Sequence, residues 1–222
     1  MSRASPFIRT VIDNSKKTAW AKRFLNIGDY ELKFIHLIRD PRALVRRWLM
    51  NNDTPEKRRK KRFQLARNNL FLSPWILSGS DEEVFVYKWL VDNRRITRFF
   101  ENNRLDFRIV TYRDIAVDTN MHIEKIVHWM GYEFEPDQVN YWNYKHHGSR
   151  KKDYDFAGKD GTRVFDLRWK SYLSTEAQLS ITENKCVKRY LDELNLCIKN
   201  DGLHICKAII SIIGFFLLRE DT

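Results

Sequence analysis

The sequence predicts an α/β fold in which a parallel sheet is flanked by helices. Three features support this prediction: short apolar runs of strand length, amphipathic stretches of helix length, and their alternation along the first half of the chain. Strands that alternate with helices form parallel sheets covered on both faces. With 222 residues, of which 43% are hydrophobic, the chain can bury the core of one domain.

The predicted elements follow in order along the chain. Strands are expected where apolar runs end at polar residues, at 7–12, 32–38 and 107–111. Helices are expected at 17–25, 41–50, a basic segment from 57, 82–101, 119–130 and 175–196. Thr175 and Gln178 form a capping box for the last helix, and Gly131 ends the helix before it. Residues 133–168 are expected to form long loops.

Residues 34–48 are the most informative stretch. The apolar run 34–38 stops at Arg39, and Asp40-Pro41 then begins a helix as its N-cap and first helical residue. Four arginines crowd this turn: Arg39, Arg42, Arg46 and Arg47. The helix macrodipole already places positive charge there, so the cluster favours a bound anion. A strand-to-helix turn is a natural phosphate site, and we expect a phosphate here.

The charge is unevenly distributed. The net charge is +11, but residues 1–72 hold 18 Lys/Arg against 6 Asp/Glu (+12), and residues 73–222 hold 22 against 23 (−1). All of the excess therefore surrounds the arginine turn, which indicates a phosphorylated or polyanionic partner. The basic run 57–62 is itself expected to be a solvated helix face.

The C-terminal part holds three cysteines, Cys186, Cys197 and Cys206. An odd number at these spacings gives neither a disulfide framework nor a zinc site, and His146-His147 lacks further ligands, so we expect no metal. Residues 1–198 are expected to form the domain and 199–222 an apolar tail. The run 208–218 is too short to span a bilayer, and we expect it to pack on the body or lie at an interface rather than contact a membrane.

Three motifs occur in a characteristic order: Val11-Ile-Asp-Asn-Ser-Lys16, Leu37-Ile-Arg-Asp-Pro-Arg-Ala-Leu44 and Val110-Thr-Tyr-Arg-Asp-Ile115. Together they resemble the sulfotransferase family, whose members use 3′-phosphoadenosine 5′-phosphosulfate as donor. Met130-Gly131 after a helix, and Trp169-Lys-Ser-Tyr-Leu-Ser174, are similar to later family segments. The resemblance is strongest to the carbohydrate-type branch. It implies a P-loop-NTPase-like sulfotransferase fold and transfer of a sulfuryl group to a hydroxyl or amine, with a carbohydrate as acceptor and no specific nucleic acid as partner.

The resemblance assigns two arginines to the donor's 3′-phosphate. Arg39 matches the family arginine that grips this phosphate, and its planar guanidinium can form two charge-assisted bonds to it. Arg47, eight residues on, takes the place of a family serine that donates to the same phosphate. The alternative for Arg39 is a surface arginine paired with a carboxylate, and the ordered motifs favour the phosphate.

The resemblance also places Lys16 and Asp13 near the transferred sulfuryl group. Lys16 would stabilise charge on the bridging oxygen, and Asp13 would orient the acceptor or accept its proton. An N-capping Asp13 beside a solvated Lys16 is an equal alternative. Arg150-Lys151 resembles the basic loop that closes over the nucleotide; a solvated loop is the preferred interpretation and donor contact the second.

One family feature has no counterpart in the chain. Sulfotransferases hold the 5′-phosphosulfate in a Gly-rich loop, but the eight glycines here lie at 28, 79, 131, 148, 158, 161, 202 and 214, no two closer than three apart. We therefore expect an N-terminally incomplete domain with an unpaired sheet edge and little or no activity. The alternative function is a non-catalytic basic module that binds a polyanionic glycan or nucleic acid. The compartment stays open: a full-length, anchored relative would face the Golgi lumen, and the chain as given would be cytoplasmic.

Overall fold

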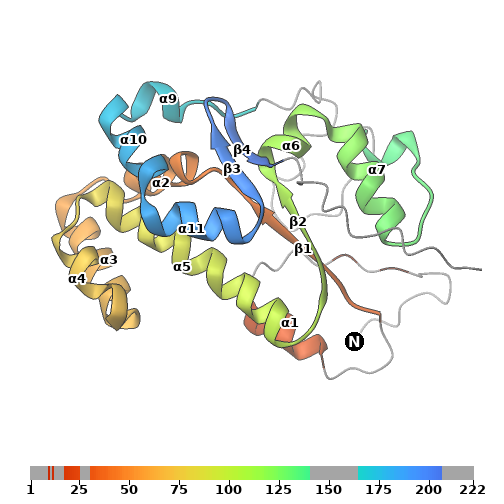
Figure 1. Ribbon diagram of the computed structural model, residues 1–222, viewed down its shortest axis with the longest axis horizontal. Coiled ribbons are helices and arrows are strands. Elements are labelled where there is room, and N and C mark those ends of the chain that lie inside the picture. Colours follow the sequence, from red (N-terminus) through yellow and green to blue (C-terminus); the bar gives the residue numbers. More distant parts are fainter. Residues whose placement is uncertain (1–9, 11, 13–17, 26–30, 141–164, 207–222) are drawn as a thin grey trace, which may run out of the picture.

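The computed structural model describes residues 10, 12, 18–25, 31–140 and 165–206. It confirms an α/β protein that is mostly helical, with a small parallel sheet of two strands (Figure 1). Strand β1 (Lys33–Ile38) pairs with β2 (Asp106–Thr111), and Ile38 lies opposite Thr111 at their carboxyl ends. A parallel pair needs a long crossover connection, and helices supply it here.

The crossover contains α2 (Pro41–Asn51), α3 (Pro55–Asn68), the 3₁₀ turn η1 (Leu70–Leu72), α4 (Ser73–Ser78) and α5 (Asp81–Asn102). Helix α1 (Thr18–Phe24) precedes β1. After β2 come α6 (Tyr112–Val117), α7 (Thr119–Trp129) and η2 (Pro136–Gln138). The described C-terminal part contains α9 (Trp169–Tyr172), α10 (Thr175–Glu183), α11 (Lys185–Glu193), β3 (Leu196–Lys199) and β4 (Gly202–Ile205).

Helix α2 begins as the sequence predicted. Asp40 is its N-cap, with a carboxylate oxygen 2.8 Å from the backbone nitrogen of Arg42, and Pro41 is the first helical residue. Helix α5 begins with a reciprocal capping box between Ser80 and Glu83. These side chains satisfy backbone N–H groups that a helix start leaves without partners, so both start points are set by local chemistry.

The alternation of side chains along β1 orients the sheet. His36 and Ile38 are buried on the face toward α5, where Asn93 and Thr97 lie within hydrogen-bonding distance of the His36 ring. On the other face Ile35 and Leu37 are 44% and 51% exposed. The expected coverage of both faces is therefore incomplete within the described part of the chain, where β2 is the only strand paired with β1.

The prediction of a single helix over residues 175–196 was wrong. The structure has two helices, α10 and α11, which meet at Asn184. The Asn184 side chain accepts hydrogen bonds from the backbone nitrogens of Cys186 and Val187 and so caps α11. Ser174, rather than Thr175, caps α10.

A short antiparallel hairpin follows α11. Leu196 in β3 lies opposite Ile205 in β4, and the buried side chains of Leu196 and Leu203 belong to the core. Strand β4 falls within residues 199–222, which were expected to form an apolar tail, so the folded domain extends beyond residue 198. Of the strand predicted at 7–12, only Thr10 and Ile12 are described, and neither lies in a strand.

The core joins the crossover to the C-terminal segments. Trp89 and Phe85 of α5 pack with side chains from α2, α9, α10 and α11, and the Trp89 ring meets Tyr190 edge-on at 5.8 Å. In Figure 1, α10 and α11 lie beside α5, α6 lies next to the β3–β4 hairpin, and α7 lies toward the right side of the molecule. None of the helices in the described ranges is both long and apolar enough to cross a membrane.

Candidate functional site

The carboxyl ends of the two parallel strands bring Arg39 and Tyr112 together. Each follows the last residue of its strand, and the guanidinium of Arg39 lies 4.5 Å from the centre of the Tyr112 ring. The backbone of Arg39 is fixed as well, because its carbonyl accepts a 2.9 Å hydrogen bond from the indole of the buried Trp89. Two of the three predicted strands therefore meet at their carboxyl ends, and residues 13–16, which follow the strand predicted at 7–12, lie outside the described residues.

A carboxylate from the C-terminal part of the chain reaches this pair. Asp166 Oδ2 lies 2.8 Å from Arg39 Nη2, and Arg168 grips the same carboxylate through Nε at 2.7 Å and Nη2 at 2.9 Å. The hydrogen bonds from Arg168, together with the positive charges of Arg168 and Arg39, hold the pKa of Asp166 well below its usual range. Asp166 is therefore a permanent anion at neutral pH.

The second arginine of the turn has a structural partner. Arg42 and Asp40 form a buried ion pair, with Nη2 2.7 Å from Oδ2 and only 6% and 8% of their side chains exposed. The Arg42 guanidinium also donates to the carbonyl of Lys199 at 2.6 Å and stacks on Trp169, 3.8 Å from the ring centre. These contacts tie α2 to the C-terminal segment, so Arg42 is not available to a ligand.

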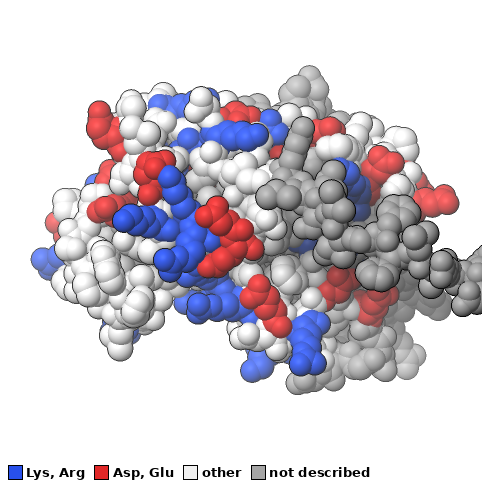
Figure 2. Space-filling view, in the orientation of Figure 1, with Lys and Arg blue, Asp and Glu red and all other residues white. Residues whose placement is uncertain are grey.

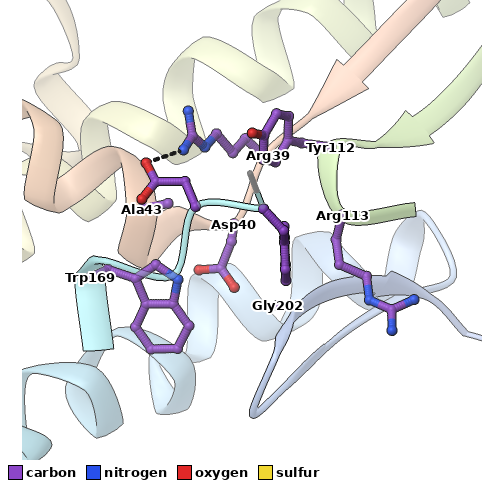
Figure 3. Close-up of a pocket in the computed structure, with 9 residues that line it drawn as sticks. Arg39, Asp40, Ala43, Tyr112, Arg113, Trp169 and Gly202 are labelled. Carbon is purple, nitrogen blue, oxygen red and sulfur yellow. Dashed lines mark hydrogen bonds and ion pairs between the residues drawn. The ribbon is translucent and has the colours of Figure 1, made fainter. Parts of the chain in front are cut away.

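Beside these contacts lies a shallow hollow that encloses only about 10 Å³, the space of about one water molecule, and is otherwise open to solvent (Figure 3). In Figure 3 the Tyr112 ring lies against the Arg39 side chain, and a dashed line marks the ion pair of Arg39 with the neighbouring carboxylate. The hollow is lined by Arg39, Asp40, Ala43, Tyr112, Arg113, Phe165, Asp166, Trp169 and Gly202.

The charges around the hollow balance. Arg113 pairs with Asp201 at 2.8 Å and approaches Asp114 at 3.3 Å. Burial opposes ionisation of Asp201, but hydrogen bonds from His204 and Arg113 outweigh it and lower the pKa of Asp201 to about 2. Four arginines (39, 42, 113, 168) thus face four aspartates (40, 114, 166, 201), so the net charge is zero. The anion expected among the arginines is supplied largely by the protein itself.

Arg39 nevertheless keeps free donor capacity. A guanidinium carries five N–H groups, and the hydrogen bonds of Arg39 to described residues use only one nitrogen, Nη2. Its Nε is buried and, like the Nε atoms of Arg46 and Arg94, finds no acceptor within the described part of the protein. Because an unsatisfied buried donor is unfavourable, this atom would gain from an additional oxygen ligand.

Of the other predicted site residues, only Arg47 is among the described residues, and it lies away from the hollow beside Arg39. Arg47 is exposed on α2, does not line the hollow and forms no ion pair with a described residue. Asp13, Lys16, Arg150 and Lys151 all lie outside the described residues. No group of three His, Cys, Asp or Glu within the described ranges could hold a metal ion.

Sequence reasoning missed the residues that complete the site. Asp166 and Arg168 fell in the stretch expected to be irregular, and no local pattern marks them as partners of a turn 127 residues earlier. The ion pair of Arg42 could have been predicted from the sequence, because Asp40-Pro41-Arg42 places a basic side chain two residues beyond an N-capping carboxylate.

Comparison of the chain with family models, curated proteins and solved structures found no match.

Proposed function

We propose that the protein binds a 3′-phosphorylated adenine nucleotide of the 3′-phosphoadenosine 5′-phosphosulfate type, with Arg39 on the 3′-phosphate, and that it is sulfotransferase-like. The observation that carries the proposal is the state of Arg39. Its guanidinium lies at the carboxyl end of a parallel strand, is oriented by Tyr112, and retains a buried Nε donor without a partner. Ligands of open α/β sheets bind at such strand ends.

Asp166 constrains how a phosphate would be held. Its carboxylate is already shared with Arg168, so a phosphate need not displace it from Arg39. Nε and the donors that Asp166 leaves unused can make the two charge-assisted bonds that a phosphate accepts from an arginine. We expect binding to be specific but modest in strength, because the balanced charges of the hollow add no general attraction for anions.

The proposed reaction is in-line sulfuryl transfer. The acceptor hydroxyl or amine forms a bond to sulfur, the bond from sulfur to the bridging phosphate oxygen breaks, and the acceptor proton is released. The products are the sulfated acceptor and adenosine 3′,5′-bisphosphate. A carbohydrate hydroxyl is the acceptor that the family resemblance favours. The roles of Lys16 at the bridging oxygen, Asp13 as acceptor base, and Arg47, Arg150 and Lys151 at the nucleotide rest on the family resemblance alone. We expect turnover to be weak or absent, because residues 1–222 contain no Gly-rich loop for the phosphosulfate.

Calorimetric titration with adenosine 3′,5′-bisphosphate tests the proposal. Arg39→Ala should weaken binding about 10- to 150-fold, since a hydrogen bond to a charged group contributes about 1.5–3 kcal/mol. The affinity of the Arg39→Lys variant should lie between those of the wild type and Arg39→Ala, because a single ammonium group replaces the planar guanidinium that can donate two parallel hydrogen bonds. Arg95→Ala, which removes an exposed arginine from α5, is the matched control.

The discriminating ligand is adenosine 5′-phosphate, which lacks the 3′-phosphate. Arg39→Ala should leave its affinity unchanged; an equal loss for both nucleotides would contradict the assignment of Arg39 to the 3′-phosphate. Binding of heparin or single-stranded DNA with no nucleotide preference and a steep salt dependence would favour the alternative, a basic polyanion-binding module. That alternative relied on Arg42, Arg46 and residues 57–62, of which Arg42, Lys57, Arg58 and Arg62 are engaged in ion pairs.

A further inference from the structure

The helical lobe of α3, η1 and α4 exposes an unusual number of large apolar side chains. Five lie between residues 63 and 77: Phe63, Leu70, Phe71, Trp75 and Leu77. We call them the apolar patch. Leu70 and Phe71 are 78% and 84% exposed at the corner between α3 and α4, and the rings of Phe71 and Trp75 lie 6.2 Å apart. Contiguous exposed apolar side chains of this kind mark interaction surfaces.

Helix α3 has two faces with opposite roles. On one face, Arg58 and Arg62 bind Asp81 at the start of α5, at 3.2 and 2.9 Å, and hold the lobe on the body. Arg62 also donates to the carbonyl of Ile76 at 2.9 Å, so it links α3 to α4. The lobe is therefore fixed by contacts that leave the other face of α3 free.

The solvent-exposed surface of α3 is cationic. Besides Lys57, which pairs with Asp53, four exposed basic residues lie on α3: Arg59, Lys60, Lys61 and Arg67. None of them forms an ion pair with a carboxylate of the described residues. Phe63 lies one turn after Arg59 and one turn before Arg67, so apolar and basic side chains share a face. In Figures 1 and 2 this lobe forms the left end of the molecule, and its surface is mostly white with blue at the margin.

We propose that the apolar patch and its basic rim bind the surface of an anionic lipid membrane. Trp and Phe side chains prefer the headgroup level of a bilayer, Leu side chains insert below it, and Lys and Arg at the rim attract anionic headgroups. The uncompensated charge of α3 is complementary to such a surface. A second protein chain is a poorer fit, because lysines are depleted at protein interfaces.

Nucleic acid is the competing polyanion. Exposed aromatic rings beside basic residues can also stack on unpaired bases. Base stacking, however, gives no role to Leu70 and Leu77, whereas membrane insertion uses both. The mixture of aliphatic and aromatic side chains therefore favours lipid.

The test is co-sedimentation of the full chain with phosphatidylcholine vesicles and with vesicles that contain about 30 mol% phosphatidylserine. Binding is expected to the anionic vesicles and not to the neutral ones. Arg59→Ala with Arg67→Ala should lower the partition coefficient about 25-fold, since each cation near the surface contributes a factor of about five. Phe71→Ser with Trp75→Ser should lower it at least about tenfold.

Two matched controls remove similar groups elsewhere. Arg95→Ala with Arg98→Ala deletes two exposed cations of α5, and Leu179→Ser deletes an exposed apolar side chain of α10; neither should change vesicle binding. Equal binding to neutral and anionic vesicles, or binding insensitive to the Phe71 and Trp75 changes, would overturn the proposal. Single-stranded DNA binding that is lost in the same variants, without vesicle binding, would assign the patch to nucleic acid. None of these outcomes bears on nucleotide binding at Arg39.

Discussion

Replacing Asp40 by alanine removes two interactions from the start of α2. The carboxylate caps the helix through the backbone nitrogen of Arg42 at 2.8 Å, and it neutralises the buried Arg42 guanidinium at 2.7 Å. Loss of an N-cap costs about 1 kcal/mol, and loss of one partner of a buried ion pair costs about 3–5 kcal/mol. Because Arg42 keeps the Lys199 carbonyl and the Trp169 ring, we expect the lower end of the sum, about 4 kcal/mol.

The assay is urea unfolding followed by tryptophan fluorescence, with the melting temperature as a second readout. A loss of about 4 kcal/mol should lower the melting temperature by about 8–16 °C for a domain of this size. Asp40→Asn retains a capping side chain and a neutral acceptor, so it should lose about 1 kcal/mol less than alanine. It also keeps the test informative where Asp40→Ala does not fold.

The double variant separates the ion pair from the cap. Arg42→Met replaces the guanidinium by an apolar side chain of similar length, and in combination with Asp40→Asn it leaves no unpaired buried charge. The double variant should be more stable than the sum of the single losses predicts, by about 2 kcal/mol. Additive losses, or a loss below about 1 kcal/mol for Asp40→Ala, would refute a buried, coupled pair.

Three further predictions concern the core and the caps. Burial lowers the pKa of His36 to about 4 despite a hydrogen bond with the Asn93 side chain, so between about pH 6.5 and about pH 4 the unfolded chain binds a proton that the folded protein does not. The free energy of unfolding should therefore fall by up to about 3 kcal/mol as the pH drops from about 6.5 to about 4. In urea unfolding of His36→Gln this pH dependence should be absent. Ser80→Ala breaks the capping box of α5 and should lower the free energy of unfolding by about 1 kcal/mol, whereas Ser180→Ala, within α10, should not lower it. Trp89→Phe leaves the Arg39 carbonyl without its indole donor and opens a small cavity, so it should cost about 2–4 kcal/mol in the same assay; an unchanged midpoint would mean that the indole does not hold the Arg39 backbone.

The parts of the fold that the sequence predicted correctly are set by local signals. The apolar run before Arg39, the Asp40-Pro41 helix start and the long amphipathic stretch of α5 each carry their own boundary, and the structure has them at Lys33–Ile38, Pro41–Asn51 and Asp81–Asn102. Caps and periodicity act within a few residues, so a single sequence contains what is needed to find them.

The errors arose where the outcome depends on competition or distance. Asn184 interrupts an otherwise continuous helical pattern because its side chain caps a new helix. The spacing of apolar residues continues across Asn184, so it does not reveal the break between the two helices. Asn200-Asp201-Gly202 was a usable hairpin signal between β3 and β4, since Gly202 adopts a φ of +142° that other residues rarely reach. The burial of Arg42 against Trp169, by contrast, joins segments far apart in sequence, and no local pattern encodes it.

Basic residues near Arg39 are paired with carboxylates, whereas several on α3 are not. At the strand ends each arginine faces an aspartate, so the hollow beside Arg39 has no net charge to attract a polyanion. On α3 the cations at 59–61 and 67 have no described carboxylate partner, so this helix is expected to attract an anionic surface. The two surfaces should therefore respond differently to salt. Nucleotide affinity at Arg39 should change little with ionic strength, because directional bonds dominate it, whereas vesicle binding by α3 should weaken steeply as screening increases. A common salt dependence would mean that both ligands bind one basic surface, and it would count against the separation of the two sites.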